Sequence, residues 1–76
     1  MRIYLGGQLS FYHPKKEPWL EVEITDPVLL ASVLVKAGIP LGEVHLVTVN
    51  DEIVELDDTI VSPLDQVRIY SAVGGG

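Results

Sequence analysis

The stretch that decides the fold, residues 38–54, reads GIPLGEVHLVTVNDEIV. Gly38 suits the end of a helix, and Pro40 prevents the helix from continuing. Residues 43–49 are mostly β-branched or apolar, which predicts a strand. Asn50-Asp51 predicts a turn, after which a second, short strand starts. This one stretch therefore contains the end of a helix and a strand–turn–strand unit.

A helix is predicted immediately before this stretch. Asp26-Pro27 is typical of a helix start, because aspartate can cap free backbone amides and proline suits the first turn. The apolar residues that follow recur at helical spacing and share one face: Leu30, Val33, Leu34 and Ala37. We expect the helix to pack this face against a sheet.

Both ends of the chain predict strands, because apolar and polar residues alternate there. Met1–Leu5 and Trp19–Thr25 alternate on either side of a proline-containing loop at residues 12–18, which predicts a hairpin. Gln66–Ser71 alternates in the same way, and we expect it to pair with Met1–Leu5 in the middle of the sheet. The sequence therefore predicts an α+β fold, in which a mixed sheet of four to five strands packs on one main helix.

Composition and charge limit the functions that are open to this chain of 76 residues. We interpret it as a single domain, 1–76, whose small core leaves little room for a buried catalytic pocket. The net charge of −6 disfavours nucleic acid as a partner, and the lack of cysteine excludes disulfides and thiolate metal sites. His13 and His45 stand apart without a ligand cluster, so no metal site is predicted. No segment resembles a signal peptide or a membrane span, so we expect a cytoplasmic protein without membrane partners.

The order of these elements is that of the β-grasp, or ubiquitin-like, fold, and individual motifs narrow the similarity. Residues 38–44 and 47–54 together resemble the ThiS/MoaD family of sulfur carriers, in which a strand leads into a V-N-G-x-x-V turn. Asp51 stands where that family usually has glycine. Residues 64–70 resemble the segment that leads into and forms the last strand in that family. The residues Ser62-Pro63-Leu64-Asp65 stand in place of the family's usual glycine–aspartate turn. Glycines at 74–76 then match the family's diglycine terminus.

The resemblance implies a carrier protein that acts through Gly76 and is not itself an enzyme. In the family, an E1-like adenylyltransferase of the ThiF or MoeB type uses ATP to adenylate the terminal carboxylate, and a sulfur nucleophile then converts it to a thiocarboxylate. The acceptor enzyme is thiazole synthase in thiamine synthesis or the large subunit of molybdopterin synthase. The residues leave this choice open, and no bound cofactor is expected.

Residues 72–76 are predicted to form a flexible functional tail. Gly74 and Gly75 lack Cβ atoms, which lets the backbone thread closely into a partner's active site. Val73 is expected to be the last side chain that anchors the tail. Two alternatives use the same residues differently: a ubiquitin-like modifier joined to other proteins through Gly76, or a β-grasp interaction domain whose tail is inert.

Residues on the outer side of the first and last strands form a candidate partner-binding face. If these strands are neighbours, one sheet face away from the helix carries Arg2, Tyr4, Arg68 and Tyr70. Arginine and tyrosine are enriched in binding hot spots, which favours a docking role. Ordinary cross-strand pairing on a solvated face is the alternative.

Overall fold

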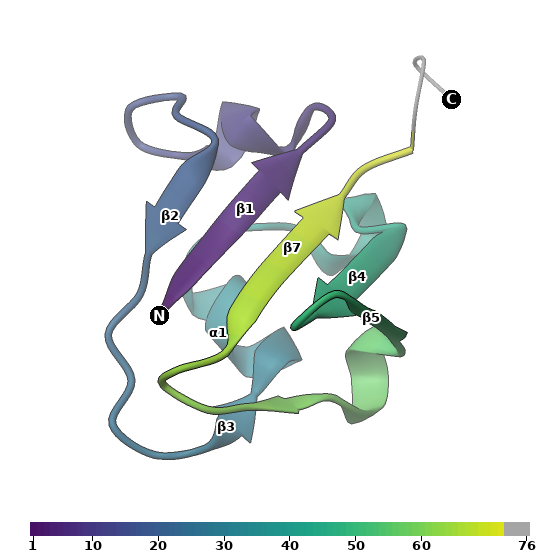
Figure 1. Cartoon of the computed structure of the whole chain (residues 1–76). Helices are drawn as coiled ribbons and strands as arrows, with labels where there is room; N and C mark the ends of the chain where they lie inside the picture. The colour runs from purple at the N-terminus through teal and green to yellow at the C-terminus, as the bar shows by residue number, and fades with distance from the viewer. Residues whose placement is uncertain (73–76) are drawn as a thin grey trace.

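The computed structural model describes residues 1–72, which form one five-stranded sheet with a helix packed on one of its faces (Figure 1). In spatial order the strands are β2 (Trp19–Glu21), β1 (Arg2–Gly6), β7 (Gln66–Tyr70), β4 (Leu46–Val49) and β5 (Glu52–Val54). The helix α1 spans Leu30–Lys36, and a separate two-stranded sheet pairs β3 (Val28–Leu29) with β6 (Ile60–Val61). Single 3₁₀ turns complete the fold: η1 (Leu9–Tyr12), η2 (Leu41–Glu43) and η3 (Leu56–Asp58).

The first and last strands pair side by side in the centre of the sheet, as the alternation predicted. β1 and β7 are parallel, and their register places Ile3 opposite Val67 and Leu5 opposite Ile69. β1 and β2 form the predicted antiparallel pair. The two central strands therefore send alternate side chains toward α1 and alternate side chains toward solvent.

A compact apolar core lies between the sheet and α1. The sheet contributes Ile3, Leu5, Val47, Val67 and Ile69, and α1 contributes Leu30, Val33 and Leu34, all of which are buried. Ala37, the fourth residue of the predicted helical face, is only partly buried. A mixed sheet packed on one helix in this strand order is the β-grasp fold, which confirms the prediction from the element order.

The turn between β4 and β5 has positive φ angles at both of its central residues, Asn50 and Asp51. Asn50 has φ 52° and Asp51 has φ 72°, and a type I′ hairpin turn requires positive φ at both positions. Asn50 also accepts a hydrogen bond from the Gln66 amide through its Oδ1 atom, at 2.9 Å. The turn is thereby fastened to the start of β7, and Asp51 takes the conformation that glycine adopts more easily.

The predicted helix start was wrong. Asp26-Pro27 does not cap α1, because Val28 and Leu29 pair with Val61 and Ile60 as strand β3 before the helix begins at Leu30. The Leu30 amide donates to the Thr59 carbonyl at 3.0 Å, and the N-cap residue Leu29 provides no side-chain hydrogen bond. The pairing of β3 with β6 therefore determines where α1 begins, and the local capping signal at Asp26 does not.

Two predicted strands are shorter than the sequence suggested, and the two short strands β3 and β6 were missed. The strand predicted at 43–49 starts only at Leu46, because η2 and its Val44 to Leu41 hydrogen bond occupy the beginning of that segment. The strand predicted at Trp19–Thr25 ends at Glu21. β6, like β3, was not predicted from the sequence.

Candidate functional site

The exit of the chain from the sheet is fixed by a contact between Ser71 and the loop after β1. Ser71 directly follows β7, is only 7% exposed, and accepts a hydrogen bond on Oγ from the Gln8 amide at 2.8 Å. The loop reaches this position because Gly7 has φ +63°. A Cβ atom on Gly7 would lie 2.2 Å from Ser71 Oγ, so only glycine permits this approach.

The other side of the exit is held by the segment before β4. The His45 amide donates to the Tyr70 carbonyl at 2.8 Å, which extends the pairing of β7 with β4 to the last residue of the strand. Hydrogen bonds on both sides therefore fix where the backbone leaves the sheet. Ala72 is the last described residue, and the predicted tail residues Val73, Gly74, Gly75 and Gly76 lie outside the described residues.

Three aromatic side chains form a row on the sheet face that lies away from α1. The Tyr4 ring centroid lies 5.2 Å from that of Trp19 and 5.9 Å from that of Tyr70. These separations are typical of favourable edge-to-face and tilted pairs. Tyr4 and Tyr70 were predicted to share this face, whereas Trp19 was not included in it. We call this row, with Arg2 and Arg68, the aromatic face.

The two arginines of the aromatic face have different environments. Arg2 lies over the Trp19 ring, 4.4 Å from its centroid, and pairs with Glu21 at 2.9 Å. Arg68 is the direct neighbour of Tyr4 in the β1–β7 register. Its Nε atom is buried and has no hydrogen-bond partner among the described residues. The structure therefore brings all four predicted face residues together and adds Trp19.

Gly6 makes the aromatic row possible. A Cβ atom on Gly6 would lie 2.3 Å from Cδ1 of Tyr70, so the Tyr70 ring occupies the space that a side chain would fill. The two adjacent glycines therefore make room for two neighbouring groups: Gly6 for the Tyr70 ring and Gly7 for the Ser71 hydroxyl. Neither contact can be seen in the sequence, because both depend on the register of β1 against β7.

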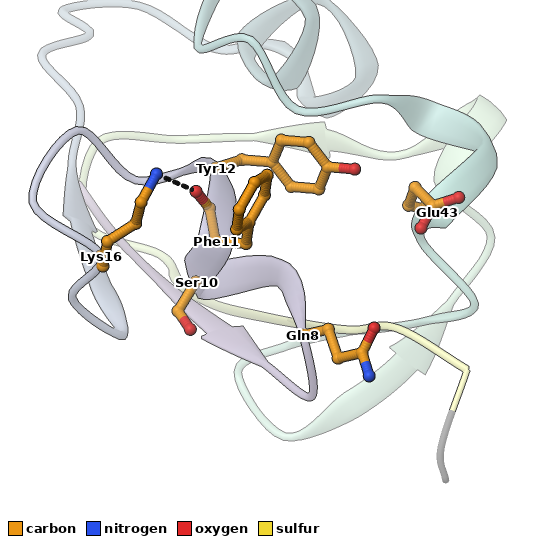
Figure 2. A pocket seen from close by; sticks show the side chains of 6 residues that line it. All are labelled: Gln8, Ser10, Phe11, Tyr12, Lys16 and Glu43. Atoms are coloured by element: carbon orange, nitrogen blue, oxygen red, sulfur yellow. Dashed lines mark hydrogen bonds between the residues drawn. The ribbon is translucent and has the colours of Figure 1, made fainter. Parts of the chain in front are cut away.

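A surface hollow of about 490 Å³ lies beside the chain exit, between η1 and η2 (Figure 2). Figure 2 shows the Phe11 and Tyr12 rings in the hollow, with Lys16 on one side and Glu43 on the other. Lys16 Nζ donates to the Phe11 carbonyl at 2.8 Å and lies 4.4 Å from the centre of the Phe11 ring. Gln8 also lines the hollow, which connects it to the Ser71 contact at the exit.

Within the part of the chain that the structure describes, no group of three or more histidine, cysteine or acidic side chains could hold a metal ion. His13 instead accepts a hydrogen bond on Nδ1 from the Lys15 amide at 2.9 Å. Among residues 1–72, no helix has the length and apolar character needed to cross a membrane.

Comparison with known proteins places this chain in a family. The profile of the ThiS family matches residues 12–76, which include β2, α1, the central strand β7 and the glycines at the end of the sequence. Searches of curated proteins and of solved structures found no match. The profile match covers most of the chain and agrees with the observed fold. The chain therefore belongs to the ThiS family of small ubiquitin-like sulfur carrier proteins.

Proposed function

We propose that this protein carries sulfur as a thiocarboxylate on Gly76. The observation that carries the proposal is the family match, which runs through the glycines at 74–76. The chain exit agrees with this role, because hydrogen bonds at Ser71 and Tyr70 hold the base of the tail on the sheet. A fixed base lets a partner enzyme bind the domain in one orientation and receive the terminal carboxylate in its active site.

The chemistry requires activation, because a carboxylate is a poor electrophile. In the proposed reaction a Gly76 carboxylate oxygen attacks the α-phosphorus of ATP, which forms an acyl-adenylate and releases pyrophosphate. A sulfur nucleophile then displaces AMP, and the product is a C(=O)–S⁻ group. An E1-like enzyme of the ThiF or MoeB type catalyses the adenylation, so this protein is the substrate of that enzyme. The sulfur is then passed to thiazole synthase or to the large subunit of molybdopterin synthase.

The direct experiment is reconstitution with ATP, a sulfide source and an E1-like enzyme of each type. The wild-type protein should gain about 16 Da, because one oxygen is replaced by sulfur. A variant that lacks Gly76 is the matched control and should gain no mass. Conjugates of higher mass with other proteins, in place of this gain, would favour a protein modifier. Equal loading of both forms would contradict the role of Gly76.

The aromatic face is the proposed docking surface for the E1-like enzyme. Tyr4, Trp19 and Tyr70 present a rigid aromatic row, with the half-buried Arg68 beside it. An enzyme that receives the tail would also cover the hollow at Phe11, which is 64% exposed. Aromatic and arginine side chains of this kind often dominate the energy of an interface.

Replacing Tyr4 by alanine should raise the KM for the carrier in the adenylation reaction by at least about tenfold. Ile60→Ala is the matched control, because Ile60 is 62% exposed on β6, outside the aromatic face. Its KM should stay within about twofold of the wild-type value. Circular dichroism of both variants checks that the fold is retained. Equal KM values for the two variants would contradict docking through this face.

A further inference from the structure

Within residues 1–72, Ser71 is the last buried residue, and its hydroxyl group holds the chain where it leaves the sheet. The hydroxyl oxygen accepts a hydrogen bond from the Gln8 amide at 2.8 Å and donates one to the Ala72 carbonyl at 3.4 Å. β1 and β7 are parallel and lie side by side, so the loop after β1 meets the chain at the end of β7 (Figure 1). We call these two hydrogen bonds the Ser71 contact.

The number of residues after the Ser71 contact limits how far the terminal carboxylate can extend from the domain. Five residues, 72–76, follow Ser71 in the sequence. An extended chain spans at most about 3.4 Å per residue, so the carboxylate can lie no more than about 17 Å from Ser71. A displacement of about 1 Å between reacting groups can slow a reaction about 100-fold. The loss of even one residue of reach is therefore large enough to affect the attack on ATP.

Release of the Ser71 contact would lengthen the tail without a change in its sequence. The Tyr70 carbonyl accepts a hydrogen bond from the His45 amide at 2.8 Å, and the Tyr70 ring occupies the space beside Gly6. Tyr70 therefore becomes the last fixed residue when the Ser71 hydroxyl is released, and the tail gains one residue, or about 3.4 Å of reach. A single hydrogen bond between neutral groups shifts an equilibrium by about fivefold, so a partner can open this contact at a measurable cost.

We propose that Ser71 is a positioning residue whose hydroxyl sets the reach of the tail, so that Gly76 meets the α-phosphorus of ATP in the partner's active site. The inference rests on the proposed adenylation of Gly76. Five residues separate Ser71 from the reacting carboxylate, so Ser71 acts through the position of the tail and not as a catalytic residue. Gly7 belongs to the same device, because a Cβ atom at that position would displace the hydroxyl.

Deletion of Ala72 tests this role, because it shortens the tail by one residue and keeps residues 73–76 unchanged. ATP–pyrophosphate exchange with the E1-like enzyme measures the adenylation of four proteins: the wild type, the deletion variant, Ser71→Ala and the combined variant. In the wild-type background the deletion should lower kcat/KM at least about fivefold, because the shortened tail reacts only after the Ser71 contact opens. In the Ser71→Ala background the contact is already absent, so the same deletion should lower kcat/KM less than about twofold.

Ser62→Ala is the matched control, because Ser62 lies before β7, at the opposite end of the strand from Ser71. In the Ser62→Ala background the deletion should still lower kcat/KM at least about fivefold. A second measurement needs no substitution of Ser71: hydrogen exchange of the Gln8 amide in the complex of carrier, enzyme and a non-hydrolysable ATP analogue. This amide should stay protected with the wild type and should exchange at least about fivefold faster with the deletion variant.

Equal effects of the deletion in the wild-type and Ser71→Ala backgrounds would overturn the proposal, because a purely structural role predicts effects that multiply. Equal exchange of the Gln8 amide in the two complexes would also overturn it, and this measurement decides the question if circular dichroism shows that Ser71→Ala does not fold. Either result, with the wild type adenylated, refutes the positioning role and leaves the proposed function intact. A wild-type protein that no E1-like enzyme adenylates would instead refute the proposed function, and this inference with it.

Discussion

Substitution of Gly7 by alanine tests the contact that fixes the chain exit. Gly7 has φ +63°, and an added Cβ atom would meet Ser71 Oγ at 2.2 Å. Gly38 offers a matched control, because it has φ +82° but no atom lies within 4 Å of its added Cβ. Both substitutions impose a left-handed backbone on alanine, and only Gly7→Ala also displaces the Ser71 hydroxyl.

The expected loss of stability has two contributions, the left-handed backbone of the alanine and the loss of the hydrogen bond of Ser71. Alanine in the left-handed region costs roughly 1–2 kcal/mol, and this term applies to both variants. Displacement of Ser71 Oγ also removes its hydrogen bond with the Gln8 amide, which costs about 1 kcal/mol more. We therefore expect Gly7→Ala to lower the free energy of unfolding by about 2–3 kcal/mol, which is about 1 kcal/mol more than Gly38→Ala does.

Urea denaturation of five proteins measures this difference: the wild type, both glycine variants, Ser71→Ala and the double variant Gly7→Ala/Ser71→Ala. Without the Ser71 hydroxyl the close contact disappears, so Gly7→Ala should cost as little in the Ser71→Ala background as Gly38→Ala costs in the wild type. Equal free energies for Gly7→Ala and Gly38→Ala would refute the Ser71 contact. Additivity of Gly7→Ala and Ser71→Ala would refute it as well.

Three further predictions concern the turns and the helix start. Asp51→Gly should raise the free energy of unfolding by about 0.5 kcal/mol, because glycine adopts the φ of 72° more easily; an unchanged or lower denaturation midpoint would contradict this. Hydrogen bonds from the Ser62 amide and the Asn50 side chain hold the pKa of Asp65 below its ordinary value of 3.8. The folded state therefore binds this proton less readily than the unfolded state, so Asp65 stabilises the fold above pH 3.8 and progressively less as the pH falls below it. Asp65→Asn should weaken this acid dependence in urea titrations at neutral and acid pH, and identical pH profiles would contradict the prediction. Leu29→Ser should add a side-chain cap to α1 and stabilise the protein by about 0.5 kcal/mol or more in thermal denaturation, whereas a lower Tm would contradict this.

The fold was predictable where a periodic pattern continues over several residues. Alternation identified β1 and β7, and apolar spacing identified the buried face of α1. The two-residue strands β3 and β6 are too short to show a period, so their pairing could not be seen. The helix start was misplaced for the same reason, since β3 occupies the residues that follow the apparent cap at Asp26.

The sequence predicted which side chains of the candidate site share a face of the sheet, but not which of them contact one another. Alternation placed Arg2, Tyr4, Arg68 and Tyr70 on one side of the sheet, and the structure brings them together. Trp19 shares this side, and its contact with Tyr4 follows from the β1–β2 register, which a single sequence does not specify. The role of Ser71 had no sequence signal, because a serine after a strand is common and its partner Gln8 lies far away in the chain.

The central claim is that sulfur resides on the carboxyl group of Gly76, and one measurement tests it most directly. After reaction with ATP, a sulfide source and an E1-like enzyme, trypsin cleaves after Arg68, the last basic residue, and releases peptide 69–76. Tandem mass spectrometry should place the entire gain of about 16 Da on the terminal glycine of this peptide. An unmodified peptide with enzymes of both the ThiF and MoeB types, or the added mass on any other residue, would contradict the claim.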